Sequence, residues 1–314
     1  MSPIIIGCHF SRHKKDPVSD TLVLLNNMFG ARTGQIFVGS PMSRLSEKSE
    51  ARWYKEAPEI KKTLSTTGMK LFVHSPYTLN FAKDAKEEDG YWITALMKEM
   101  RIAHAIGAEG CVLHMGKAVK LNTTQAEAFF HQNLVTVLDT VQAEKLNVKL
   151  FVETSAGQGT ELYPTRDNSL DNLARFYNAF TPSQKQILRL CVDTCHVYAA
   201  GMDLSTAESV KRFWDDWERL IGVENLAVIH INNSSKAQGS RADRHANILE
   251  GKIPREGLSA FIKAAKKHAI PMILETPNCQ FDIVNVLELS GHEKTRAMSY
   301  EEWYRAAAFQ QIGV

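Results

Sequence analysis

The sequence predicts an α/β fold: a single (β/α)₈ TIM barrel with an added C-terminal helix. Three observations predict it. Eight short apolar runs recur along the chain, helix-like segments separate them, and no linker interrupts the alternation. A chain of 314 residues with 44% hydrophobic composition can bury the core that such a barrel needs.

The apolar runs are short and nearly free of polar residues, which is typical of parallel strands buried on both faces. Eight is also the number of strands in a closed barrel of this type. In chain order, the predicted strands are Ile4–Ile6, Gln35–Val38, Lys70–Val73, Gly110–Leu113, Lys149–Val152, Leu188–Val192, Ala227–Ile231 and Pro271–Leu274.

The segments between these runs carry helical signals. In Thr124–Lys145, Thr124 and Glu127 fit a capping box, and apolar residues follow at helical spacing. Ser205 and Glu208 fit a second capping box, which predicts the start of another helix. The alternation of strand and helix is thus continuous.

The chain is expected to form one domain over residues 1–314, because no stretch rich in Pro, Gly or Ser divides it. From about residue 276 onward we expect a closing helix and a C-terminal extension. Ser299 and Glu302 fit a capping box there, and the spacing of Trp303 and Ala307 predicts an added helix over Ser299–Gln311 on the barrel exterior.

The charge balance neither favours nor excludes a nucleic-acid partner. The formal net charge is +2, so such a partner requires a local basic surface. The first apolar run is too short for a signal peptide, and no apolar run is long enough to span a membrane. We therefore expect a soluble, intracellular, monomeric protein; nucleus, cytoplasm and virion are not distinguished.

The five cysteines form an odd number without CxxC spacing, and thiols inside cells are normally reduced. We interpret them as small buried hydrophobic residues. A redox pair or metal site formed by Cys191 and Cys195 is the alternative.

The ends of the predicted strands carry the chemical signal. Six apolar runs end in or contain a potential metal ligand: LFVHS, CVLHM, LFVET, LCVDT, AVIHI and MILET. The intervals are 40, 39, 40, 37 and 45 residues, about one strand-helix unit each, so a barrel brings all six to its C-terminal mouth. A single polar residue at a strand end is explained equally well by a hydrogen bond in a turn or in the core. Six such residues in one chain are not. They are His74, His114, Glu153, Asp193, His230 and Glu275.

Three carboxylates at one mouth repel each other, and cations are the simplest way to keep them ionised. Mixed His and Asp/Glu ligation suits zinc, with manganese or iron as alternatives for part of the set. His196, Asp243 and His245 are further candidates, because they lie in loops on the same face and the Asp-x-His pair faces one side of an extended segment. The sequence gives no functional signal for His9.

Several longer motifs resemble the signature blocks of the endonuclease IV family of abasic-site endonucleases: HSPYTLN, VETSAGQGTEL, CVDTCHVYAAGMDL, GSRADRHANILEGKI and LETPN. The resemblance covers roughly Gly7 to Asn278 and leaves the C-terminal segment outside. It implies about three zinc ions per chain. By resemblance, His74 and His114 hold the first ion, Glu153 bridges it to the second, Asp193, His230 and Glu275 complete the second, and His196, Asp243 and His245 hold the third.

The resemblance also implies an activity. Such an enzyme repairs double-stranded DNA that contains abasic sites: it cleaves the phosphodiester on the 5′ side and leaves a 3′-hydroxyl, a step of base excision repair. A zinc-activated hydroxide is the expected nucleophile, with Glu153 and Glu275 as catalytic residues at the metal pair. An abasic nucleotide lacks stacking and pairing, so flipping it into a metal pocket is comparatively easy.

Candidate DNA contacts follow from the same resemblance. Tyr77 aligns with the family's DNA-penetrating tyrosine, and Arg44 aligns loosely with another inserting residue; a rim aromatic and a solvated arginine are the alternatives. Lys236, Arg241 and Arg244 belong to a basic run around the DRH motif that suits phosphate contact, although such runs are often simply solvated.

The chain departs from the family pattern at three positions. Asn233 stands where Asp is usual, and Met115 and Lys117 stand where Pro and Ser are usual. None of these changes removes a proposed ligand, but Asn233 puts an outer-shell carboxylate in doubt.

Two other functions compete. A metal-dependent sugar isomerase or epimerase would use only Glu153, Asp193, His230 and Glu275, and would leave the other five candidates without a shared purpose. A catalytically silent DNA-binding barrel is suggested only by the departures. A count of bound metal ions separates the first rival from the nuclease.

Overall fold

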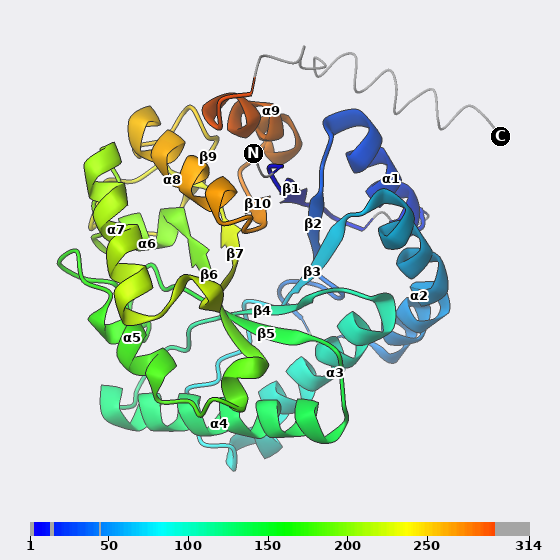
Figure 1. Cartoon of the computed structure of the whole chain (residues 1–314). Coiled ribbons are helices and arrows are strands. Elements are labelled where there is room, and N and C mark those ends of the chain that lie inside the picture. Colours follow the sequence, from blue (N-terminus) through cyan, green and yellow to red (C-terminus); the bar gives the residue numbers. More distant parts are fainter. Residues whose placement is uncertain (1–2, 13–15, 44, 293–314) are drawn as a thin grey trace.

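Parallel strands close into a barrel, and helices form a ring around it (Figure 1). The computed structural model describes residues 3–12, 16–43 and 45–292. The barrel order is β1-β10-β7-β6-β5-β4-β3-β2. The strands are β1 (Ile6–His9), β2 (Thr33–Ile36), β3 (Lys70–His74), β4 (Gly110–His114), β5 (Lys149–Glu153), β6 (Leu188–Asp193), β7 (Leu226–His230) and β10 (Met272–Leu274).

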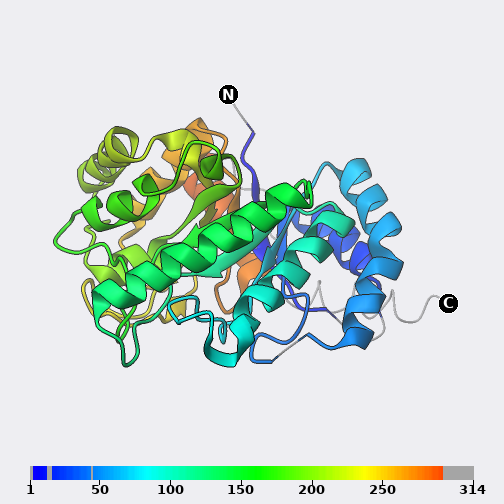
Figure 2. The same ribbon diagram turned by 90° about the horizontal axis from the view of Figure 1, so that it is seen from below.

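The helices cover the outside of the barrel, and Figure 2 shows α4 running across the face seen from below. Short 3₁₀ turns occur at Glu87–Gly90, Gln184–Gln186 and Val223–Asn225. The α-helices are α1 (Val18–Phe29), α2 (Glu47–Thr67), α3 (Tyr91–Ile106), α4 (Thr123–Ala143), α5 (Asp171–Asn178), α6 (Thr194–Ala200), α7 (Ala207–Leu220), α8 (Arg255–Lys267) and α9 (Cys279–Leu289). Among the described helices, none is long and apolar enough to cross a bilayer.

The predicted barrel is confirmed in the described part of the chain, but its first two strands are displaced. β1 spans Ile6–His9, whereas Ile4–Ile6 was predicted. β2 spans Thr33–Ile36, whereas Gln35–Val38 was predicted. His9 and Gln35 therefore lie at the carboxyl ends of neighbouring strands, where the register pairs them directly.

The barrel interior holds an apolar layer beneath its mouth. One buried residue of this layer lies two positions before each of the six strand-end ligand candidates, so both point to the same side of their strand. The layer closes the barrel below the mouth, which leaves the polar residues clustered above it. Its members are Phe72, Val112, Phe151, Cys191, Val228 and Ile273.

Of the three predicted capping boxes, the two that lie within the described residues are wrong by one or two residues. Asn122 caps α4 by accepting a bond from the Gln125 amide at 2.9 Å, because Asn precedes Thr124 and is the stronger cap. Thr206 and Ser209, not Ser205 and Glu208, form the box that opens α7.

The last strand is followed by α9, which lies beside α1 and closes the ring of helices (Figure 1). A short antiparallel pair, β8 (Asn233–Ser234) and β9 (His245–Ala246), brackets the loop that carries the DRH motif. The added helix predicted over Ser299–Gln311 and the candidate Arg44 lie outside the described residues.

Candidate metal centre at the barrel mouth

All six strand-end candidates meet at the C-terminal mouth of the barrel. Five of them are the last residues of β3 to β7, and Glu275 follows β10 directly. Strand register sets His114 opposite Glu153 and Asp193 opposite His230. His74, Glu153, Asp193 and His230 are buried, while His114 and Glu275 are partly open.

The Glu153 carboxylate lies at the centre of the cluster. Its Oε2 is 3.0 Å from His114 Nε2 and 3.5 Å from His74 Nε2. Its Oε1 is 2.8 Å from His230 Nδ1 and 3.5 Å from His196 Nδ1. One carboxylate thus faces four imidazoles, all of them potential metal ligands.

Glu275 and Asp193 face the other side of His230. The His230 Nδ1 atom is 3.2 Å from Glu275 Oε2 and 4.0 Å from Asp193 Oδ2. The ligand atoms of Glu153, Asp193, His230 and Glu275 all lie within 4.8 Å of one another, and so do those of His74, Glu153 and His230. These are the spacings of groups that can share an ion.

The three further candidates form a group of their own beside this cluster. His196 lies in α6, just after β6, and its Nε2 is 3.3 Å from Asp243 Oδ2. His245 Nε2 is 3.3 Å from Asp243 Oδ1 and 3.4 Å from Asp193 Oδ2. Asp193 therefore joins the group to the strand-end cluster, and all nine sequence candidates lie in one contiguous site.

Electrostatics keep the Glu153 carboxylate ionised although it is buried. Burial by itself raises the pKa of Glu153, but the imidazoles of His230, His114 and His196 lower it well below its usual range. Burial likewise opposes the charge on His196, yet Asp193 and Glu153 raise its pKa well above the ordinary value. The cluster is thus balanced by protons wherever a cation does not balance it.

Three polar atoms in this cluster have no hydrogen-bond partner among the described residues: Glu153 Oε2, His196 Nε2 and His245 Nε2. Buried polar atoms without partners are costly, and atoms that converge on one cluster suit a shared cation. Imidazole and carboxylate donors are the ones zinc accepts in mixed sites. The residues present therefore fit a divalent metal.

The cysteines are free thiols in the described chain. Cys195 Sγ falls within 4.8 Å of ligand atoms of Asp193 and His245, whereas the sequence had offered Cys195 as a metal ligand only together with Cys191. Burial raises the pKa of Cys195 to about 12, so the group stays a neutral thiol. A disulfide between Cys191 and Cys195 is absent in the described structure, and both side chains are buried.

Tyr77 stands at the rim of the mouth, in the connection after β3, with 53% of its surface exposed. Its ring centroid is 5.2 Å from His114 and 5.6 Å from His74, so the aromatic face adjoins the ligand cluster. Its backbone N–H donates to Pro41 O at 3.0 Å, which ties two mouth loops together. Burial raises the pKa of the phenol, which therefore remains uncharged.

The basic candidates Lys236, Arg241 and Arg244 are exposed on the loop between β8 and β9. The Arg241 N–H donates to Ala199 O at 2.9 Å, and this bond anchors the loop to the end of α6. The loop also carries Asp243, so these three cations border the third ligand group.

The departures from the family pattern do not reach the ligands. The Asn233 amide donates to Ile248 O at 2.8 Å and Ile253 O at 3.1 Å, so it holds a loop. Lys117 pairs with Glu161 at 3.2 Å, away from the cluster, and Met115 is buried.

Three residues at the mouth were not identified from the sequence: Asn232, His9 and Gln35. Asn232 donates to Asp193 Oδ2 at 2.7 Å, and its Oδ1 accepts from the Glu275 backbone at 2.8 Å. His9 and Gln35 also contact Glu275. A histidine that closes the run IIIGCH is the same signal that identified His74, but the predicted strand stopped three residues too early.

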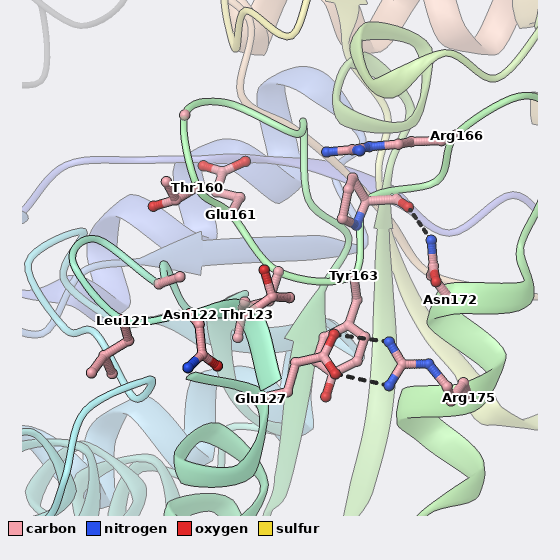
Figure 3. A pocket seen from close by; sticks show the side chains of 14 residues that line it. Leu121, Asn122, Thr123, Glu127, Thr160, Glu161, Tyr163, Arg166, Asn172 and Arg175 are labelled. Atoms are coloured by element: carbon pink, nitrogen blue, oxygen red, sulfur yellow. Dashed lines mark hydrogen bonds and ion pairs between the residues drawn. The ribbon is translucent and has the colours of Figure 1, made fainter. Parts of the chain in front are cut away.

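A separate pocket of about 540 Å³ lies between the loops that precede α4 and α5 (Figure 3). None of the nine candidates lines it. Glu127 and Arg175 point toward each other across it and form two hydrogen bonds of 2.8 Å.

Comparison with known proteins agrees with this geometry. Residues 28–304 match the family model described as a xylose isomerase-like TIM barrel. A protein named endonuclease 4 from Acanthamoeba polyphaga mimivirus is 32% identical over 279 residues, 88% of this chain and 84% of that protein. One from Mycoplasma pneumoniae is 35% identical over 250 residues, covering 79% and 82%.

A solved structure shows the same likeness. The crystal structure of endonuclease IV from Thermus thermophilus superposes with a TM-score of 0.71 at 26% identity, covering 96% of this chain and 99% of that one.

Proposed function

Because this chain belongs to the endonuclease IV family, we propose that it cleaves the phosphodiester on the 5′ side of abasic sites in double-stranded DNA and leaves a 3′-hydroxyl end. It is a deoxyribonuclease IV-like enzyme that acts on DNA, with buried His, Glu and Asp clusters suited to metal binding. About three zinc ions per chain are proposed, from nine ligands in three partly shared groups.

One observation supports the nuclease over a sugar isomerase of similar fold. The group His196, Asp243 and His245 is joined through Asp193 to the strand-end cluster. An isomerase needs only the four-residue set at the strand ends, whereas a reaction at a phosphodiester uses additional positive charge for the phosphate and leaving oxygen. The further group supplies ligands for that charge.

The proposed assignment of residues to each ion follows the contacts between their side chains. His74 and His114 would hold one ion, and Glu153 would be shared with a second ion held by Asp193, His230 and Glu275. Bound there, divalent ions activate water and stabilise charge on the phosphate. Ligand carboxylates set the charge of the pair, which is why Glu153 and Glu275 are the proposed catalytic residues.

The protein's remaining part is to hold the damaged strand. Tyr77 offers an aromatic face beside the cluster, where it can stack against bases around the flipped sugar. Lys236, Arg241 and Arg244 can contact phosphates, which positions the duplex without reading its sequence. Selectivity then comes from the pocket, since an abasic nucleotide costs little to unstack.

The test is incision of an end-labelled duplex that carries one tetrahydrofuran abasic analogue, by the full chain loaded with zinc. We expect a single cut on the 5′ side, a product that a DNA polymerase extends, and no cut in the intact duplex. Elemental analysis of the same preparation should give about three ions. A fully occupied protein with one ion, or one that leaves the abasic duplex intact, contradicts the proposal.

A further inference from the structure

Gln35 is a buried amide in the mouth that belongs to none of the ligand groups. It lies near the carboxyl end of β2, is 0% exposed, and pairs in register with His9 of β1. Interior positions of such barrels are usually filled by branched apolar side chains. The polar atoms of a buried amide at this position must form hydrogen bonds with other groups of the protein.

Both polar ends of the Gln35 side chain have partners among the mouth residues. Its Nε2 donates to Glu275 Oε1 at 2.7 Å and lies 3.1 Å from His9 Nδ1. Its Oε1 lies 2.9 Å from His230 Nε2. One side chain thus connects the Glu275 carboxylate, directly after β10, with the His230 imidazole at the end of β7, and both face the same cluster.

These contacts fix which way the amide and the imidazole are oriented. An ionised carboxylate only accepts hydrogen bonds, so the NH₂ end of Gln35 must face Glu275. The carbonyl end then faces His230 Nε2, which must therefore carry a proton and donate it. The other ring nitrogen, Nδ1, is left facing Glu153 Oε1 at 2.8 Å and Glu275 Oε2 at 3.2 Å.

We propose that Gln35 is a positioning residue for the metal pair: it fixes His230 with Nδ1 turned toward the shared carboxylates and holds Glu275 beside it. The inference rests on the proposed function, because it takes a divalent cation as the group that Nδ1 and the two carboxylates share. Outer-shell hydrogen bonds of this kind orient a ligating imidazole and set which nitrogen binds.

The test compares wild-type chain with Gln35→Met, which keeps the volume of the side chain and removes both hydrogen-bonding ends. Zinc affinity is measured by competition with a coloured chelator. We expect one ion to bind about 10–100-fold more weakly, as for other outer-shell partners, and the remaining ions to be retained. In the zinc-loaded wild type, the His230 Nε2 proton should give a downfield, slowly exchanging NMR signal that the variant lacks.

Thr33→Val is the matched control, because Thr33 faces the same side of β2 one layer deeper. Its buried hydroxyl donates to Met272 O at 2.9 Å, away from the ligands. This variant should lose stability without losing zinc affinity or the His230 signal. Gln35→Asn, which withdraws the amide by one carbon, serves as a second variant if Gln35→Met does not fold, and should lose the signal in the same way.

Unchanged zinc affinity and an unchanged His230 signal in the Gln35 variants would overturn the inference while leaving the proposed function standing. Equal losses of affinity in Thr33→Val and Gln35→Met would also overturn it, because the effect would then be general destabilisation. A wild-type protein that binds no metal at all overturns both.

Discussion

The barrel mouth and the pocket between α4 and α5 both gather charged side chains on one barrel, but the charges are balanced in different ways. In the pocket every carboxylate has a protein cation: Glu127 makes two bonds of 2.8 Å to Arg175, and Glu161 lies 3.2 Å from Lys117. In the mouth, Glu153 Oε2 has no hydrogen-bond partner among the described residues. It faces imidazoles such as that of His114, and imidazole is the commonest metal ligand in proteins.

The difference shows that the presence of a pocket does not by itself identify a reactive site. Charges that the protein already pairs hold loops in place and have little left to offer a ligand. Ionisable groups crowded into one buried cluster are stable only when protons or a cation balance their charges. The mouth is therefore the place for chemistry, and the paired pocket is explained by its own salt bridges.

The largest difference between the two regions should appear when one carboxylate is neutralised in each. Glu275→Gln should retain the fold but lose at least about a hundredfold in incision, because several kcal/mol of charge compensation at the metal pair disappears. Circular dichroism and incision of the abasic duplex measure the two properties. Glu127→Gln, the matched change in the pocket, should leave incision near the wild-type rate; equal losses in both variants would erase the distinction.

The next effect concerns the rim of the mouth. Tyr77→Ala should weaken incision of abasic duplex by up to about a hundredfold, since base-aromatic stacking is worth roughly 1–3 kcal/mol per base. Binding of intact duplex should change less, and affinity should still fall as salt rises. Fluorescence titration with both duplexes checks this, and an equal loss on both would assign Tyr77 a nonspecific role.

The mouth should also show a pH dependence that the pocket lacks. Burial opposes charge on His245, but Asp193 and Glu275 raise its pKa to about 9 in the metal-free protein. The stabilising effect of that proton is complete below the unfolded value near 6.5 and is lost as pH rises through about 9. Metal must displace the proton, so affinity should rise with pH, and the contribution of His245, about tenfold per pH unit, should level off near pH 9.

Calorimetry in buffers of different ionisation enthalpy measures this proton release directly. His245→Asn should release fewer protons per chain on metal binding than the wild type. Metal binding with no proton release between pH 6.5 and 9 would contradict the assignment of His245 as a ligand.

The smallest effect is expected in the pocket. Arg175 is exposed, so the double-mutant cycle of Glu127→Gln and Arg175→Ala should give a coupling energy of about 0.2–1 kcal/mol in urea unfolding. Incision should not change. A coupling above about 2 kcal/mol, or a loss of incision, would show that this pair does more than hold α4 against α5.

The sequence alone predicted the barrel and, from the strand ends, six of the nine candidate metal ligands that cluster at its mouth. Parallel strands that are buried on both faces are apolar throughout, so a single His, Asp or Glu at the end of such a run is conspicuous. Repetition at about 40 residues then places those ends at one mouth, whatever the details of the helices between them. This rule alone is enough to predict that Glu153 and His230 lie at the mouth.

The tertiary structure decided the residues around that cluster. Gln35 and His9 lie at strand ends only because pairing between β1 and β2 shifts both strands away from their most apolar stretches. A strand end is fixed by hydrogen bonds to its neighbours, and these are nonlocal. The two capping boxes were misplaced because neighbouring residues, Asn122 and Thr206, cap the helices instead. The Glu127 side chain, predicted to take part in the first box, pairs with an arginine 48 residues away. Local pattern therefore predicted the candidate ligands, while the residues that hydrogen-bond to them depend on contacts between distant parts of the chain.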